Sequence, residues 1–278
     1  MQALEPRIFD AVWRAVEGYL PPRPQPWHPL GCHRPRVPDR QCFYGLVVRL
    51  VTGCSWRDAG RLVRVGATTL RRRRSEWLGA GVFEKLCEEA ICAYDKVIGL
   101  DLTEVALDGS THKAPCGGEG TGPNPTDRAK IGWKWSIVTD THGVPIGWAI
   151  DGANRHDSIL LPATLHAVAA RGPLVDVETL HLDRGYDSSV VRNYCAKVGL
   201  DDVAGAKKRK NGSAKGTKNP QPLGLRWPVE RTNAWFSSYG QLRRNTDRFI
   251  RQRLAEIALA VTFVLTIKLF VYADRWNR

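Results

Sequence analysis

Residues 179–206, TLHLDRGYDSSVVRNYCAKVGLDDVAGA, decide the fold class of this 278-residue chain. The apolar run Thr179–Leu182 is β-like and ends at Asp183, and Asp202–Ala206 is a further short β-like run. Between them, Ser188–Val198 has the apolar spacing of a helix. The order predicts a β-α-β unit with Asp183 at the end of its first strand.

Upstream of this unit, the sequence predicts three more strands. They are Thr103–Leu107, Lys134–Thr139 and Val144–Ile150, and Asp140-Thr141-His142-Gly143 supplies the hairpin turn between the last two. A helix across Ser158–Ala170 follows. Three strands in a meander and then β-α-β describe an α/β fold with a mixed sheet flanked by helices, which we place in a domain of residues 96–278.

The remainder of this domain is read as helical. A polar, cationic loop spans 207–225, and helices are expected from Pro228 to Tyr239 and from about Phe249 to Tyr272. The glycine-rich run 117–122 lacks the lysine and the spacing of a phosphate-binding loop, so we expect a plain loop and no nucleotide cofactor. The most apolar stretch, 257–267, is too short to span a bilayer and reads as a buried helix, so no membrane partner is expected.

Residues 1–95 are predicted to be all-helical. A proline-rich segment, 21–38, follows a short first helix. Two helices then cover 39–65, with a break at 52–55 where Ser55 is a plausible N-cap, and a third opens at Thr68-Thr69. Helix, short turn, helix across about 55–80 resembles a helix-turn-helix DNA-binding segment. An ordinary helical bundle with a basic exterior is the alternative.

The charge of the chain favours a polyanionic partner. Its formal net charge is +13 and its pI is about 9.7. Residues 61–74 hold six arginines and no acid, and residues 207–218 hold six lysines and arginines and no acid. Clusters of this kind suit DNA phosphates, although a solvated basic face has the same composition. The run Arg71–Arg74 is expected to point largely outward, mostly towards phosphates.

The cysteines indicate a reducing compartment. Seven cysteines, with no CxxC pair, are typical of free thiols, and the first ten residues lack an apolar signal core, so a cytoplasmic protein is expected. A zinc site made of Cys32, His33 and Cys42 would fit no usual ligand spacing.

Three carboxylates carry the candidate chemistry. Asp108 lies in LDGST (107–111), Asp183 in LDRGYD (182–187), and Glu230 in RWPVERTNAWF (226–236). Brought together by a fold, they would hold two Mg²⁺ ions for phosphodiester chemistry, since Mg²⁺ prefers oxygen ligands. Each has another explanation: Asp108 and Asp183 as strand-end turn residues, and Glu230 as an acid that complements a helix N-terminus.

Long phrases of the chain resemble a DDE transposase of a bacterial insertion sequence, of the insertion-sequence-five family. They are LDGSTHKAPCGGEGTGPNPTDRAKIGWKWSIVTDTHGVPIGWAIDGANRHDS, LHLDRGYDS and RWPVERTNAWFSSYGQLRRNTDR, and TGCSWRDAG resembles the N-terminal helical region of that family. The resemblance implies a ribonuclease H-like catalytic domain and Asp108, Asp183 and Glu230 as the catalytic, metal-binding triad. It implies Mg²⁺ as cofactor, in two ions that Mn²⁺ can replace.

The resemblance also implies partners and DNA contacts. The expected partners are double-stranded DNA, as element ends with terminal inverted repeats and as target, and further copies of the chain in a homo-oligomer on DNA. Of the tyrosine, arginine, glutamate and lysine that often surround the last acid, Arg226 and Glu230 match, while Leu223 and Ser237 replace the other two. Two alternative functions stay open, a nuclease without strand transfer and an inactive DNA-binding derivative. The candidate DNA-binding residues are Arg71, Arg72, Arg73, Arg74, Lys207, Lys208, Arg209, Lys210, Arg226, Arg231, Arg243 and Arg244.

Overall fold

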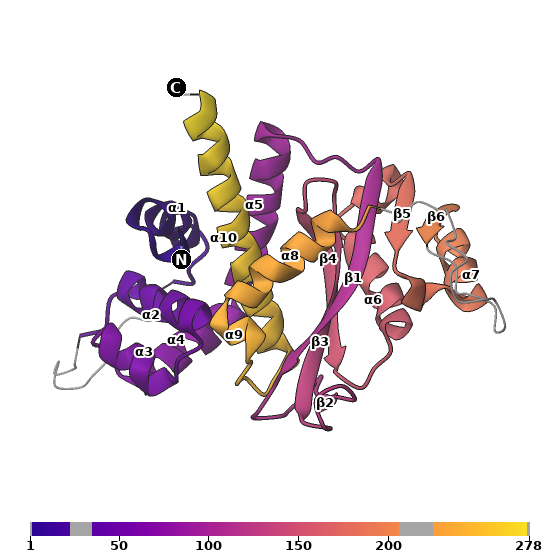
Figure 1. Cartoon of the computed structure of the whole chain (residues 1–278). Coiled ribbons are helices and arrows are strands. Elements are labelled where there is room, and N and C mark those ends of the chain that lie inside the picture. The colour runs from indigo at the N-terminus through magenta and orange to yellow at the C-terminus, as the bar shows by residue number, and fades with distance from the viewer. Residues whose placement is uncertain (1, 23–34, 206–224, 277–278) are drawn as a thin grey trace. The chain divides into compact units, whose positions relative to one another are not determined.

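The computed structural model describes residues 2–22, 35–205 and 225–276, and the chain forms two compact units (Figure 1). The helical unit consists of residues 1–98 and 236–278, and the α/β unit of residues 99–235. The expected boundary near residue 96 lies close to the observed one. The assignment of residues 236–278 to the catalytic domain is corrected, because their long helix packs on N-terminal helices.

The α/β unit is built on one mixed sheet. Its strands lie in the order β4-β3-β1-β5-β6, with the short β2 also paired to β3. The pairs β1/β3 and β3/β4 are antiparallel, whereas β1/β5 and β5/β6 are parallel. This order and these directions are those of a ribonuclease H-like sheet, so the predicted fold class is confirmed. The strands are β1 (Glu104–Lys113), β2 (Gly122–Pro123), β3 (Ile131–Thr139), β4 (Pro145–Gly152), β5 (Thr179–Leu182) and β6 (Asp202–Gly205).

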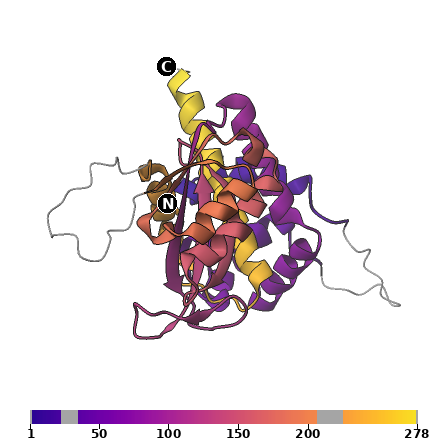
Figure 2. The ribbon, with the colours of Figure 1, turned by 90° about the vertical axis from the view of Figure 1, so that its right-hand side faces the viewer.

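Side-chain alternation gives the sheet two different faces. On one face, Leu107 of β1, Val138 of β3 and Leu182 of β5 join the apolar core. The helices α6 (Asp157–Ala169) and α7 (Ser189–Lys197) lie on this side of the α/β unit (Figure 2). They contribute Leu161, Leu165, Val191 and Cys195 to the same core. The other face, which carries Asp108, is contacted by α8 (Trp227–Ser238). The sheet therefore separates an apolar side from a side that bears the candidate chemistry.

The first strand is longer than predicted. The expected strand ended at Leu107, but β1 continues to Lys113 because residues 108–113 pair with Gly132–Ile137 of β3. Polar residues lie on both sides of this extension, so an apolar pattern could not reveal it. His112, within this extension, is a buried strand residue. The extension places Asp108 inside a strand, with paired backbone on both sides.

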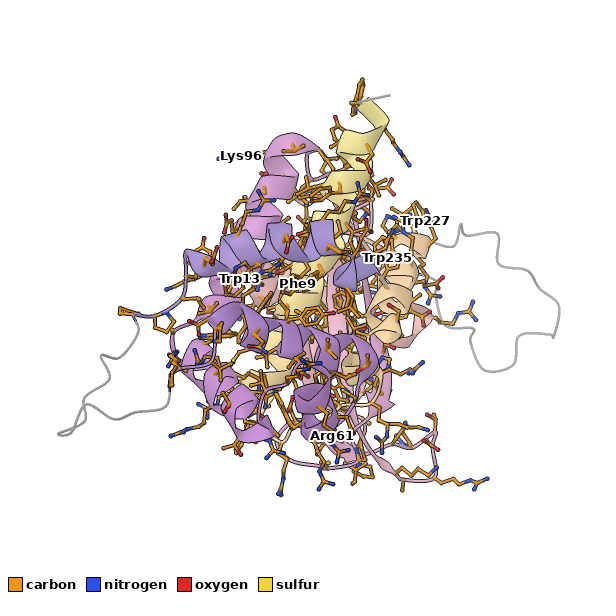
Figure 3. The ribbon with its side chains drawn as sticks, turned by 90° about the vertical axis from the view of Figure 1, so that its left-hand side faces the viewer. Phe9, Trp13, Arg61, Lys96, Trp227 and Trp235 are labelled. Carbon is orange, nitrogen blue, oxygen red and sulfur yellow. The ribbon has the colours of Figure 1, made fainter. Side chains whose placement is uncertain are left out.

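The helical unit holds the rest of the described chain. Phe9 and Trp13 of α1 pack on Phe43 of α2, with ring centroids 5.7 Å apart in both pairs (Figure 3). The long C-terminal helix α10 packs along α5. The helical elements are η1 (Gln2–Leu4), α1 (Pro6–Glu17), α2 (Asp39–Thr52), α3 (Trp56–Leu62), α4 (Ala67–Gly79), α5 (Val82–Val97), α9 (Gly240–Arg243) and α10 (Ile250–Trp276).

The helices α2, α3 and α4 contact one another, and a short turn joins α3 to α4 within the segment 55–80. The Ser55 hydroxyl accepts a hydrogen bond from the Asp58 amide and caps α3 as predicted. Gly53 ends α2 with a φ of 69°, and a side chain there would overlap the backbone of Gly240. Any other residue would be strained by the positive φ and would also clash with the Gly240 backbone.

The helix α10 is long and apolar enough, by length and composition, to cross a membrane. In its most apolar 18-residue window, 61% of the residues are buried within the structure, as in the core helix of a folded domain. The fully buried side chains include Ile257, Val261 and Phe263. This agrees with the prediction of a buried helix for 257–267.

Candidate active site

Asp108 and Asp183 leave neighbouring strands at the same level of the sheet. The parallel strands β1 and β5 pair Leu107 with Leu182, so the next residue on each strand is one of the two acids. Because side chains alternate, both carboxylates point to the face opposite the apolar core. The 75-residue separation of the two acids in the sequence is closed by strand pairing alone.

Glu230 is connected to this pair through Arg226. The Arg226 guanidinium lies 3.4 Å from Asp183 Oδ1 through Nη1 and 3.2 Å from Glu230 Oε1 through Nη2. Arg226 and Glu230 are one helical turn apart, so both project from the same side of the start of α8. The side chains of Asp183 and Glu230 are 42% and 55% exposed, which leaves them open to a ligand from solvent. The structure thus places all three predicted acids in one neighbourhood.

Asn233 holds Asp108, and the sequence analysis did not identify it. Its Nδ2 donates to Asp108 Oδ2 at 3.1 Å, and its Oδ1 accepts from Trp135 Nε1 at 2.8 Å. The His112 ring stacks on Trp135 with centroids 3.7 Å apart, and its Nε2 lies 2.8 Å from Ser110 Oγ. The position of Asn233, three residues after Glu230 on the same helix, was the available signal.

His181 fixes the segment that leads into α8. Its Nδ1 accepts a hydrogen bond from the Leu225 amide at 2.9 Å, and its Nε2 lies 3.1 Å from Glu104 Oε2. Because Leu225 precedes Arg226 directly, this contact sets where the guanidinium meets Asp183. His181 is two residues before Asp183, and both side chains lie on the same face of the sheet. The same segment therefore supplies Asp183 and the histidine that holds the backbone next to its partner Arg226.

Burial changes the acidity of Asp108. Desolvation raises the pKa of its carboxyl to about 6, the hydrogen bond from the Gly109 amide and the Arg226 charge lower it, and the charges of Asp183 and Asp157 raise it further. Burial likewise lowers the pKa of the His112 imidazole to about 4, so this histidine is neutral at physiological pH. A carboxylate in this environment is stabilised by any nearby positive charge.

The donor set fits hard divalent cations. Within residues 2–22, 35–205 and 225–276, no group of three or more His, Cys, Asp or Glu side chains is placed to hold a metal together. In this arrangement the Arg226 guanidinium provides the positive charge between Asp183 and Glu230. Carboxylate oxygens at neighbouring strand ends, one of them desolvated, are the ligands that Mg²⁺ and Mn²⁺ prefer. Asp108, Asp183 and Glu230 would be the residues that hold such ions.

The helix α8 also carries an aromatic and cationic surface beside Glu230. The Arg231 guanidinium lies 4.5 Å from the centroid of Trp227 and 4.8 Å from that of Trp235 (Figure 3). Its Nη2 donates to the carbonyl of His142. Trp227 is 53% exposed, which is unusual for a large aromatic side chain that only packs in a core.

The arginine run of α4 does not face outward as expected. Arg71 and Arg72 are exposed, but Arg73 and Arg74 are buried. Arg73 pairs with Asp39 at the start of α2. The outward prediction is therefore wrong for two of the four, because a helix turns by about 100° per residue and directs consecutive side chains to different faces. Arg73 and Arg74 are therefore not accessible to DNA phosphates in this structure.

Arg74 belongs to a buried ionic network. It forms a bidentate pair with Asp247, through Nη1 at 2.7 Å and Nη2 at 2.9 Å, and stacks on Trp56 at 4.5 Å. Arg49 lies 2.6 Å from Glu256 and 3.4 Å from Asp247. The two arginines hold the pKa of the Asp247 carboxyl well below its usual range, against the effect of burial. The network joins α2, α4 and α10.

The other predicted DNA contacts have mixed positions. Arg243 and Arg244 are exposed at the end of α9. Lys207, Lys208, Arg209 and Lys210 lie outside the described residues, as do Cys32 and His33 of the disfavoured zinc site. The glycine-rich segment leads into the short strand β2 rather than into a helix, in agreement with the expectation of a plain loop.

Curated relatives cover parts of the chain. A "putative transposase for insertion sequence element IS402" of Burkholderia cepacia is 38% identical over 133 residues, which are 46% of this chain and 60% of that protein. The chain therefore matches less than two thirds of that relative's length. A second protein of the same organism, the "insertion element IS402 uncharacterized 16.2 kDa protein", is 31% identical over 44% of this chain and 82% of its own length.

Two solved structures show weak likeness. A pre-cleavage Mos1 transpososome has a TM-score of 0.31 at 11% identity, with 87% of this chain and 79% of that chain covered. The Mos1 mariner paired end complex with Mn has a TM-score of 0.32 at 12% identity, with 98% and 84% covered.

Two families match consecutive parts of the chain. Residues 8–87 match the family described as "putative transposase of IS4/5 family", and residues 99–265 match the family described as "transposase DDE domain". The second match covers more than half of the chain and contains Asp108, Asp183 and Glu230 in the geometry described above. The chain belongs to the family of DDE-domain transposases.

Proposed function

We propose that this protein binds the terminal inverted repeats of its insertion sequence and moves the element by cleaving DNA and joining its 3′ end to target DNA. The observation that carries the proposal is the placement of Asp108 and Asp183 on neighbouring strands and one face of the sheet. Arg226 links Glu230 to Asp183, and Asn233 of the same helix as Glu230 bonds to Asp108. Acids brought to one face from two neighbouring strands and a helix are an unusual structural choice unless they share a ligand.

The proposed chemistry has two in-line steps at one site. In the first, a water oxygen attacks the phosphorus at the element end, the bond to the 3′ oxygen breaks, and a 3′-hydroxyl is freed. In the second, that hydroxyl attacks a target phosphodiester, a new P–O bond forms, and the target's 3′ oxygen leaves with a proton. Two divalent ions, Mg²⁺ or in its place Mn²⁺, would when bound activate the attacking oxygen and neutralise the leaving oxygen.

The chain's own residues would hold and orient this centre. Asp108 is fixed by Asn233, and Asp183 and Glu230 by Arg226. Once cations neutralise the acids, the Arg226 guanidinium is free to bind a DNA phosphate beside the reacting bond. Trp227, exposed beside Glu230, together with Arg231 and Trp235 offers a stacking surface for a splayed base.

Duplex binding is proposed for the helical unit. Because Arg73 and Arg74 are buried, the candidate phosphate contacts of this unit are the exposed arginines Arg71, Arg72, Arg243 and Arg244. We propose that the chain acts as a homo-oligomer on paired DNA ends, in the bacterial cytoplasm. The proposed location rests on the seven cysteines of the chain, which include no CxxC pair.

The test incubates purified protein, Mg²⁺ and labelled element-end DNA with a plasmid target, in parallel with Asp183→Asn. Cleaved and joined products with the native chain, and neither with the variant, are the expected result. Cleavage without joining would favour a nuclease of the same fold. Binding with neither product would favour an inactive DNA-binding derivative, and near-normal cleavage by Asp183→Asn would contradict the assignment of the triad.

A further inference from the structure

A polar cluster lies directly behind Asp108, on the opposite face of the sheet. Asp157, the first residue of α6, places its Oδ1 against Gly109, so closely that a methyl group on Gly109 would overlap it. Oδ1 also lies 2.8 Å from Lys134 Nζ, and this ammonium donates to the Arg155 carbonyl at 3.0 Å. A fourth acid is thus held in contact with the backbone that carries Asp108.

Two buried hydroxyls belong to the same cluster. Ser136 is paired directly with Gly109 across β1 and β3 and is fully buried. The Tyr186 hydroxyl is also buried and lies within the electrostatic reach of Asp157, Asp108 and Asp183. The two hydroxyls lie beside each other, and Ser136 acts as a hydrogen-bond partner that lowers the pKa of Tyr186 against the larger opposing effect of burial. A pair of buried hydroxyls thus lies beside the backbone that carries Asp108.

An ordinary structural role does not account for all of these features. A latch between α6 and the sheet requires only the Lys134–Asp157 pair. It does not require glycine next to the first catalytic acid, and it does not require a negative charge where Asp108 is already desolvated. The Asp157 carboxylate contacts Gly109, the chain neighbour of Asp108, and so places a second negative charge close to that acid in the metal-free protein. The same charge would favour a bound cation.

We propose that Asp157 is a positioning residue of the catalytic centre. Its carboxylate contacts the backbone at Gly109, beside Asp108, and adds a negative potential that Lys134 partly neutralises. This potential tightens binding of a divalent cation by Asp108 and Asp183. This inference rests on the proposed metal site. Outer carboxylates of this kind commonly change metal affinity by about 10–100-fold.

The test titrates Mn²⁺ into the full chain without DNA and follows free Mn²⁺ by electron paramagnetic resonance. Asp157→Asn should weaken binding by about tenfold. Lys134→Gln should tighten binding by roughly threefold or more, because it removes a positive charge near the site. Asp127→Asn is the matched control: Asp127 also pairs with a basic residue, Lys130, but lies in the turn before β3, and binding should stay within about twofold of the native chain.

The signs of the effects distinguish the proposal from a structural latch. If Asp157→Asn and Lys134→Gln both weaken Mn²⁺ binding and both lower Tm, the pair only holds α6 in place and the proposal is wrong. Unchanged binding in Asp157→Asn refutes it as well. If Asp157→Asn does not fold, Lys134→Gln decides, since unchanged or weaker binding overturns the proposal. If the native chain binds no Mn²⁺, or Asp108→Asn binds as well as the native chain, the proposed metal site itself fails.

Discussion

The arginine run of α4 provides a matched pair of variants from adjacent faces of one helix. Arg74 is buried in a bidentate pair with Asp247, whereas Arg72 is exposed. The change to methionine keeps most of the side-chain length and removes the charge in both cases. We expect Arg74→Met to reduce stability and Arg72→Met to reduce DNA binding.

The expected loss of unfolding free energy in Arg74→Met follows from the environment in which the variant leaves Asp247. Asp247 is 4% exposed and would retain Arg49, at 3.4 Å, as a basic partner and Glu256 as a hydrogen-bond partner. Removal of one partner from a buried ion pair costs about 3–5 kcal/mol of unfolding free energy. For a chain of this size that corresponds to a fall in Tm of roughly 10 °C. Thermal unfolding followed by circular dichroism measures it.

Arg72→Met should leave Tm within about 2 °C, because exposed charges contribute little to stability. If Arg72 touches a phosphate, the variant should bind element-end DNA more weakly. The slope of log affinity against log salt should then fall by about one. Fluorescence anisotropy at several salt concentrations measures both quantities.

Two results would refute this reasoning. If Arg74→Met changes the unfolding free energy by less than about 1 kcal/mol, the buried network does not stabilise the helical unit as argued. If Arg74→Met unfolds like the native chain and has a reduced salt slope, Arg74 faces DNA, and the original outward prediction was right for it.

Four further predictions concern the residues Asp108, Asn233 and Ser55. Asp108→Asn should stabilise the metal-free protein at pH 7 by about 1–3 kcal/mol of unfolding free energy. The pKa of Asp108 is about 6 in the folded chain and roughly 3.9 in the unfolded chain, so its contribution to stability is present below pH 4 and is lost as pH rises through 6. Equal unfolding curves for the variant and the native chain at pH 7 would contradict this. At subsaturating Mg²⁺, cleavage by the native chain should fall below about pH 6, because protons then compete with the cation for Asp108, and Arg72→Met should not shift this pH dependence. Asn233→Ala should reduce cleavage by about 10–100-fold with little change in Tm, whereas the exposed Asn193→Ala should not, and equal rates would exclude a positioning role for Asn233. Ser55→Ala should lower the unfolding free energy by about 1 kcal/mol, and no change in chemical denaturation would argue against the cap.

Local pattern was sufficient for most of the elements. Apolar runs and turn residues predicted the strands that end at Asp183 and surround the 140–143 turn, and Ser55 was found as a cap because capping depends on neighbouring residues only. The acids themselves followed from motif and resemblance. Polar pairing hid the second half of β1, since a strand stabilised by its partners need not be apolar.

Long-range contacts decided the rest, and no local pattern contains them. Arg74 pairs with Asp247, 173 positions away in the sequence, so half of the basic run that was predicted to face DNA is buried in the core. Asn233 bonds to Asp108 across 125 positions, so an amide that the sequence did not point to belongs to the site. The C-terminal helix joined the helical unit for the same reason, because its apolar side chains are buried against partners far away in the sequence. The sequence determined which residues are strands, helices and acids. Only the tertiary structure determined which charged side chains are buried in ion pairs and which are exposed and can bind a ligand. The reason is that the free-energy cost of burying a charge depends on its partners in space and not on its neighbours in the sequence.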